Sequence, residues 1–100
     1  MANINEVKDF VDVMSGTVIV DVWAPWCAPC KQMTPIFDDL SDQFDKINFM
    51  KCNVDDFPKF AQNYNIKSIP TFIIFQDGVL KEQITGSITK NFMEGVLKRY

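Results

Sequence analysis

Apolar stretches separated by turn residues run along the whole chain and predict a sheet with helices between its strands. Runs of apolar residues at 17–23, 47–54 and 71–75 predict three strands. The first run is apolar on both faces, which is typical of a central strand that is covered on both sides. An Asp-Gly turn at 76–78, followed by a run at 79–84, predicts an antiparallel hairpin partner for the third strand.

Apolar residues spaced three and four apart predict the helices. The spacing indicates a short helix at about 5–14 and a long one at 28–44, which continues through Pro35 with a bend. A short helical segment at 55–63 and a final helix capped by Thr89 complete the set. The predicted apolar faces are Val7, Phe10, Val11 and Met14 in the first helix, Met33, Ile36, Phe37, Leu40 and Phe44 in the long helix, and Phe92, Met93, Val96 and Leu97 in the last.

The order of elements defines the fold class. It reads helix, strand, helix, strand, helix, strand, strand, helix, with a vestigial strand expected at 2–4. Because strand–helix–strand connections cross right-handed, we predict an α/β fold with a central mixed sheet of four to five strands and helices on both faces. No repeat, low-complexity tract or linker divides the chain, so we expect residues 1–100 to form one domain.

Composition and charge narrow the class of function. The apolar fraction of 47% and charged fraction of 23% are typical of a globular protein. A net charge of −3, with no cluster of Lys or Arg, argues against nucleic acid or an anionic membrane as a partner. The first residues lack the features of a signal peptide, and no run reaches membrane-spanning length, so we expect a reducing cytoplasm, where structural disulfides are rare.

Two residues separate Cys27 from Cys30, and the pair lies between the first strand and the long helix. The N-terminus of a helix stabilises a thiolate, and a second thiol one turn further can resolve the mixed disulfide that the first one forms. Zinc sites use the same spacing, but the chain has no histidine and only one other cysteine, Cys52. The pair is therefore interpreted as a redox centre in preference to a metal site.

Three separate segments resemble the thioredoxin family, and the resemblance covers essentially the whole chain. Residues 23–31 resemble its active-site segment, Asp21 stands where the family carries a buried acid, and residues 69–71 resemble its cis-proline loop. The resemblance implies the thioredoxin fold and a general protein disulfide reductase. Such an enzyme is a thiol-disulfide oxidoreductase that takes part in electron transport and cell redox homeostasis.

The resemblance also implies a role for each site residue. Cys27 is expected to be the attacking nucleophile and Cys30 the resolving thiol. Burial of Asp21 should raise its pKa so that it transfers the proton of Cys30, with Lys51 moderating the shift. We expect Pro70 to be cis and the substrate to add as an extended segment against a small exposed patch. The expected substrate-binding residues are Trp26, Ala28, Pro29, Ile69, Pro70 and Gly86.

The resemblance implies partners but no bound cofactor. Electrons are expected to come from NADPH through a thioredoxin reductase and to pass to oxidised proteins such as ribonucleotide reductase, peroxiredoxin and methionine sulfoxide reductase. A monomer is expected. The dithiol-oxidising relatives often carry a histidine between the cysteines, and this chain does not, which argues against an oxidant or isomerase. A scaffold or accessory subunit with the same fold remains the non-enzymatic alternative.

Several positions leave alternatives open. Asp21 is alternatively an edge-strand acid that reaches water or pairs with Lys51, and Cys30 alternatively only packs in the core. Ala28 replaces the glycine most common in the family motif, which should change the redox potential modestly. The N-terminal strand is short. Cys52 is an added thiol, interpreted as a small buried hydrophobic residue, with a regulatory thiol as the alternative.

Overall fold

The computed structural model describes residues 4–100, and its strands form one mixed sheet in the order β1-β3-β2-β4-β5. β1 and β2 both run parallel to β3, whereas β4 runs antiparallel to β2 and to β5. The predicted α/β fold with a mixed central sheet is confirmed. The strands are β1 (Asn5–Glu6), β2 (Thr17–Trp23), β3 (Asn48–Asn53), β4 (Thr71–Gln76) and β5 (Val79–Thr85).

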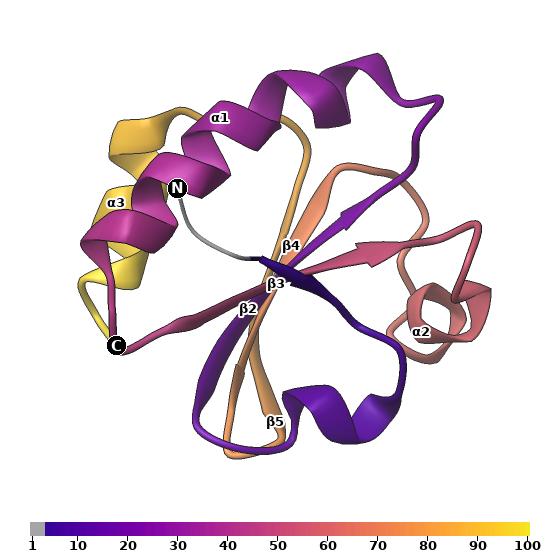
Figure 1. Ribbon diagram of the computed structural model, residues 1–100, viewed down its shortest axis with the longest axis horizontal. Helices are drawn as coiled ribbons and strands as arrows, with labels where there is room; N and C mark the ends of the chain where they lie inside the picture. Colours follow the sequence, from indigo (N-terminus) through magenta and orange to yellow (C-terminus); the bar gives the residue numbers. More distant parts are fainter. Residues whose placement is uncertain (1–3) are drawn as a thin grey trace.

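Helices cover both faces of the sheet. α1 (Ala28–Gln43) and α3 (Lys90–Leu97) lie on one side, and α2 (Pro58–Asn63) lies on the other (Figure 1). A 3₁₀ helix, η1 (Phe10–Val13), connects β1 to β2. Side chains alternate between the two faces along each strand, so the core divides into two clusters. The α1 side contains Ile19, Met33, Phe37, Phe49 and Phe72, and the α2 side contains Val18, Val20, Val22, Phe60 and Phe75.

β2 lies in the middle of the sheet, where the apolar pattern places it. It pairs with β3 on one side and β4 on the other, and every residue from Val18 to Val22 is buried. α1 begins directly after the short loop that follows β2 and continues through Pro35. This connection carries Cys27 to the end of the sheet, at the N-terminus of the long helix.

The turn and the helix cap predicted from the sequence are both present. Asp77 and Gly78 both have positive φ, as the turn of a tight hairpin requires, and they join β4 to β5. Thr89 caps α3, and its side chain accepts a hydrogen bond from the Phe92 backbone N–H at 3.1 Å. Phe92 itself is 54% exposed, so its assignment to the apolar face of this helix is wrong.

The helix predicted at about 5–14 is wrong. Its first part is β1, and only Phe10–Val13 is helical, as a 3₁₀ helix that Asp9 caps together with Asp12. A 3₁₀ helix repeats every three residues, so Val13 is buried and Val11, which α-helical spacing would bury, is 67% exposed. Met14, also expected on the buried face, is 46% exposed. The vestigial strand expected at 2–4 falls mostly outside the described residues, and the strand begins at Asn5.

Candidate active site

Cys27 and Cys30 form a disulfide at the N-terminus of α1, with their Cα atoms 5.3 Å apart. Cys27 is the N-cap residue, and its Sγ accepts a hydrogen bond from the Cys30 backbone N–H at 3.3 Å. Pro29 lies in the first turn, where its missing N–H leaves no hydrogen bond unmade. Cys27 is 6% exposed and Cys30 2%, so the thiol at the helix end is also the more accessible one. The peptide dipoles that meet at Cys27 stabilise negative charge on its sulfur.

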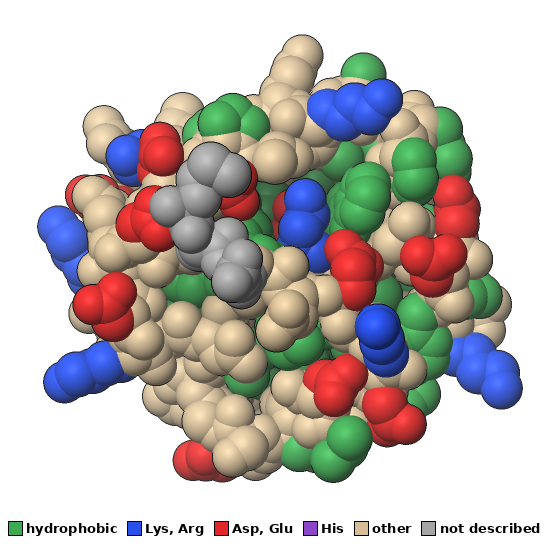
Figure 2. All heavy atoms as spheres, in the orientation of Figure 1, with side chains coloured by type: hydrophobic (Ala, Val, Ile, Leu, Met, Phe, Trp, Pro, Cys, Tyr) green, Lys and Arg blue, Asp and Glu red, His purple; other side chains and the backbone are tan. Residues whose placement is uncertain are grey.

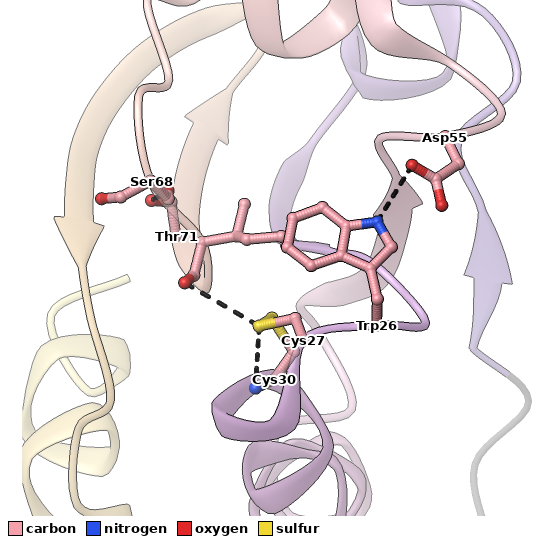
Figure 3. Close-up of a disulfide and its surroundings, with 7 residues drawn as sticks. Trp26, Cys27, Cys30, Asp55, Ser68 and Thr71 are labelled. Carbon is pink, nitrogen blue, oxygen red and sulfur yellow. Dashed lines mark hydrogen bonds between the residues drawn. A yellow bond between two sulfur atoms is a disulfide. The ribbon is translucent and has the colours of Figure 1, made fainter.

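Trp26 lies near the disulfide, with its indole nitrogen toward Asp55 (Figure 3). The residue is 68% exposed, and its indole Nε1 donates a hydrogen bond to Asp55 Oδ1 at 3.3 Å. The backbone N–H of Asp55 in turn donates to Asn53 Oδ1 at 2.9 Å. The large exposed ring is therefore held in place by the loop that follows β3.

The loop before β4 lies against the disulfide. The Ile69–Pro70 peptide bond is cis, as predicted, and the Ile69 carbonyl oxygen lies 3.9 Å from Cys27 Sγ. Gly86, whose φ is +97°, donates its N–H to the Pro70 carbonyl at 2.8 Å, which fixes the loop to the end of β5. Within the part of the chain that the structure describes, the Ile69 N–H and carbonyl make no hydrogen bond to other backbone groups. Both groups are therefore available to an added extended segment.

The predicted substrate patch needs one correction. Trp26, Ala28 and Pro29 are exposed, and Ile69 and Gly86 are half-buried, but Pro70 is buried. Ile69, and not Pro70, therefore contributes to the surface at this loop. An open pocket of about 380 Å³ continues this surface between α2 and the Ile69 loop. Its lining includes Trp26 and Ile69 together with Val54, Ile66 and Lys67, which the sequence reasoning missed.

Asp21 is fully buried in β2, and neither of its carboxylate oxygens has a hydrogen-bond partner among the described residues. The pKa of Asp21 is raised from 3.8 to about 7, chiefly by burial; Lys51 lowers it, and Glu6 and Asp38 contribute to raising it. The alternative in which Asp21 is an edge-strand acid is wrong, because β2 lies between β3 and β4. The burial predicted for Asp21 is confirmed, and its role in proton transfer stays a prediction.

Lys51 lies beside Asp21 in the β2–β3 register but makes no ion pair with any carboxylate in residues 4–100. Its ammonium instead lies 4.7 Å from the centroid of the Trp23 ring, a cation–π contact. The direct Asp21–Lys51 pair considered from the sequence is therefore wrong. Lys51 lowers the pKa of Asp21 through space.

Glu6 also contacts this group of residues, although no pattern in the sequence indicates it. Its Oε2 accepts a hydrogen bond from Trp23 Nε1 at 2.9 Å, and its Oε1 accepts one from the Asn53 backbone N–H at 2.8 Å. Glu6 ends β1, which pairs with β3 through only two residues, and the apolar spacing of this segment predicts a helix instead. Because β1 is two residues long and pairs with a strand far along the chain, it has no alternating apolar pattern by which the sequence could identify it.

Cys52 lies on the α2 side of the sheet and is fully buried, as predicted. Its thiol donates a weak hydrogen bond to the Phe57 carbonyl at 3.9 Å. Burial, with smaller contributions from Glu6 and Asp56, raises the pKa of Cys52 to about 12. Cys52 is thus a protonated core residue in this state.

Outside the disulfide region, the features that would indicate another kind of site are a charged surface patch, a metal site and a membrane-spanning helix. Acidic and basic side chains are interspersed over the face shown in Figure 2. From Ile4 onwards, no group of three or more His, Cys, Asp or Glu side chains is placed to hold a metal ion. No helix in the described residues is long and apolar enough to cross a membrane.

Comparison with known proteins agrees with this geometry. The family model for thioredoxin matches residues 2–99. The chain is 42% identical to the chloroplastic M-type thioredoxin of Spinacia oleracea over 94 residues, which are 93% of this chain and 52% of the relative. It is 39% identical to thioredoxin of Synechocystis over 84 residues, 83% of this chain and 78% of the relative. The crystal structure of oxidized mitochondrial thioredoxin 3 from Saccharomyces cerevisiae superposes with a TM-score of 0.88 and 27% identity, covering 97% of this chain and 95% of that one.

A disulfide at the N-terminus of a helix, facing a cis-proline loop on a mixed sheet, defines a thioredoxin-fold protein with a redox-active cysteine pair. The thioredoxin family model matches nearly all of the chain, so the chain belongs to the thioredoxin family. It spans about half the length of the plant relatives that it matches.

Proposed function

We propose that the protein is a general protein disulfide reductase. The observation that carries the proposal is the Cys27–Cys30 disulfide, with Cys27 Sγ at the N-terminus of α1 and next to the free backbone of Ile69. A dithiol placed there has a stabilised attacking thiolate and a resolving thiol one turn away. An extended segment of substrate can bind to Ile69 at the same point.

The reaction transfers two electrons in two exchange steps. The Cys27 thiolate attacks one sulfur of a substrate disulfide, a mixed disulfide forms, and the other substrate sulfur leaves as a thiolate that takes up a proton. Cys30 then loses its proton to Asp21 and attacks Cys27 Sγ. The Cys27–Cys30 disulfide forms, the second substrate sulfur leaves, and the substrate is reduced as the pair is oxidised. Burial of Asp21, with its pKa of about 7, supports its assignment as the proton acceptor.

The proposed substrate surface combines backbone pairing with apolar contact. Ile69 supplies one N–H and one carbonyl to the substrate backbone, and the exposed ring of Trp26 contacts its side chains. The pocket of about 380 Å³ between Trp26 and Ile69 receives an apolar side chain next to the substrate cysteine. A surface of this kind selects for extended, apolar segments and not for one sequence, which supports a general reductase.

The expected partners and compartment belong to the same proposal. NADPH recharges the disulfide through a thioredoxin reductase, and the targets are oxidised proteins such as ribonucleotide reductase, peroxiredoxin and methionine sulfoxide reductase. Membership of the thioredoxin family supports such partners as a class. We propose a reducing compartment and, as its first candidate, the cytoplasm; the spinach relative is chloroplastic.

Reduction of insulin disulfides tests the proposal. We expect turnover both with dithiothreitol and with NADPH plus a thioredoxin reductase as the source of electrons. Cys52→Ser should retain this activity, since Cys52 is buried on the other face of the sheet from α1. Activity with dithiothreitol but not with NADPH and thioredoxin reductase would contradict thioredoxin reductase as the electron donor. Inactivity with both would contradict the proposed function and favour a scaffold or accessory role.

A further inference from the structure

Glu6, Lys51 and Asp21 form a row of alternating charge across three neighbouring strands. Glu6 of β1 pairs in register with Lys51 of β3, and Lys51 pairs in register with Asp21 of β2. Strands in a sheet lie about 4.8 Å apart, so the bases of the three side chains are adjacent. Ile19 and Phe49, each two residues before a member of the row, pack against α1, so the row lies on the α1 side.

The lysine in the middle of this row pairs with neither acid. Its ammonium lies over the Trp23 ring, 4.7 Å from the centroid. That ring is held by Glu6, whose Oε2 accepts from the indole Nε1 at 2.9 Å and whose Oε1 accepts from the Asn53 N–H at 2.8 Å. Glu6 thus fixes the ring on which Lys51 lies, and Asp21 is left buried without a hydrogen bond.

We propose that Glu6 is a positioning residue for proton transfer by Asp21: by holding the Trp23 ring that carries the Lys51 ammonium, it keeps Lys51 from forming an ion pair with Asp21. This inference rests on the proposed reductase function, in which Asp21 accepts the proton of Cys30. Glu6 touches neither the substrate nor the reacting sulfurs, and it acts through Trp23 and Lys51.

The direction of the effect follows from the charges that face Asp21. They are Lys51 from β3, Glu6 from β1 and Asp38 from α1, and burial has a larger effect on the pKa than any one of them. Removing the negative charge of Glu6 lowers the pKa of Asp21 directly. Releasing Lys51 to approach Asp21 lowers it again, because a nearby positive charge favours the carboxylate.

The first experiment measures the titration of Asp21 in the oxidised protein from its carboxyl carbon resonance in NMR. We expect Glu6→Gln to lower the midpoint by roughly half a pH unit or more. The variant loses the negative charge of Glu6 and lets the Lys51 ammonium approach Asp21, and both charges lie close enough to act on a buried carboxyl. Asp56→Asn is the matched control, because it removes one carboxylate charge on the α2 side and should leave the midpoint unchanged. An unchanged midpoint in Glu6→Gln would overturn the inference.

A second set of variants separates positioning from simple charge. Lys51→Met should raise the midpoint of Asp21, and adding Glu6→Gln to Lys51→Met should lower it by less than Glu6→Gln does alone, because no ammonium remains to be released. Equal shifts in the two backgrounds would overturn the positioning role. Glu6→Asp, which keeps the charge, should restore the raised midpoint at least in part. If Glu6→Gln alone does not fold, Lys51→Met still tests the inference, because an Asp21 midpoint that this variant leaves unchanged would overturn it.

A kinetic measurement links the row to catalysis. The rate at which Cys30 resolves a mixed disulfide between Cys27 and an aromatic thiol can be followed by the absorbance of the released thiol. We expect the pH midpoint of this rate to fall in Glu6→Gln together with that of Asp21. A lowered Asp21 midpoint with an unchanged rate profile would overturn the link to proton transfer. Failure of the parent protein to reduce insulin would contradict the proposed function instead, before any variant is compared.

Discussion

The three cysteines lie in two regions that bury them to a similar extent but surround their sulfurs with opposite hydrogen-bonding groups. Cys27 and Cys30, at 6% and 2% exposure, are nearly as inaccessible as Cys52. Cys27 Sγ accepts a backbone N–H at the N-terminus of α1, whereas the Cys52 thiol donates to the Phe57 carbonyl. The first environment stabilises a thiolate, and the second stabilises a thiol.

The contrast shows that buried cysteines can face opposite neighbouring dipoles and charges, so burial alone does not set the reactivity expected of each. Burial, together with smaller contributions from the carboxylates of Glu6 and Asp56, raises the pKa of Cys52 to about 12. At Cys27, burial also disfavours a charged sulfur, but the N-terminal backbone N–H groups of α1 favour it. Four predictions test this comparison.

Replacing the two active-site cysteines should give the largest effects. We expect Cys27→Ser to abolish reduction of insulin, and Cys30→Ser to accumulate mixed disulfides through Cys27, because only the helix-end sulfur forms a ready thiolate. Non-reducing gels of the protein mixed with oxidised substrates measure the trapped species. Equal trapping by both variants would contradict the assignment of roles and would weaken the contrast with Cys52.

Asp21→Asn should give the next largest effect, on both stability and turnover. The folded pKa of Asp21 is raised from 3.8 to about 7, so the native state holds a proton that the unfolded chain has released, and stability falls as pH rises through this window, by roughly 4 kcal/mol in all. We expect Asn to stabilise the protein by about 2 kcal/mol at about pH 8, less than the full amount because its amide is also buried unpaired, and to have little effect at about pH 5.

Urea unfolding at the two pH values measures the stability change, and the rate of mixed-disulfide resolution measures the function. Turnover at neutral pH should slow, because the candidate proton acceptor is gone. Raised stability with unchanged turnover would leave Asp21 a structural residue. Lowered stability at the higher pH would mean that Asp21 gains more from Lys51 than it loses on burial.

Most of the fold could be predicted because its signals are local. The two-faced apolar run that became β2, the Asp77-Gly78 turn and the Thr89 cap each act within a few residues. The first segment could not be predicted, because β1 is defined by pairing with β3 some forty-five residues later. The spacing of Val7, Phe10, Val11 and Met14 fits an α-helix by coincidence.

The candidate site divides in the same way. The positions of Cys27, Cys30 and the cis bond at Pro70 follow from motifs that are continuous in sequence. The position of Lys51 on Trp23 and the contacts of Glu6 depend on the order of strands across the sheet, which no window of the sequence contains. Charged residues that act across a sheet are therefore the part of a site that sequence reasoning finds last.

Cys52→Ala should have a small effect on stability and none on reductase activity. Loss of the buried sulfur from a site on the α2 side of the sheet should cost about 1 kcal/mol, as small core truncations do. Urea unfolding and the insulin assay measure the two. In the oxidised parent, where Cys27 and Cys30 are joined, Cys52 should resist alkylation. Rapid alkylation would contradict the contrast between the two regions and revive Cys52 as a regulatory thiol.

Asp56→Asn should give the smallest effect. It tests how much a nearby carboxylate, as opposed to burial, contributes to the raised pKa of Cys52. Asp56 raises the pKa of Cys52, so removing its charge lowers that pKa, but Asp56 is exposed and solvent screens it. We therefore expect the pH midpoint for alkylation of Cys52 in urea-free, oxidised protein to fall by only about a few tenths of a unit, with the thiol still protonated at neutral pH. Asp55→Asn, on the neighbouring residue that bonds Trp26, is the control and should leave the midpoint unchanged. A fall large enough to ionise Cys52 near neutrality would mean that carboxylates, and not burial, keep this thiol inert.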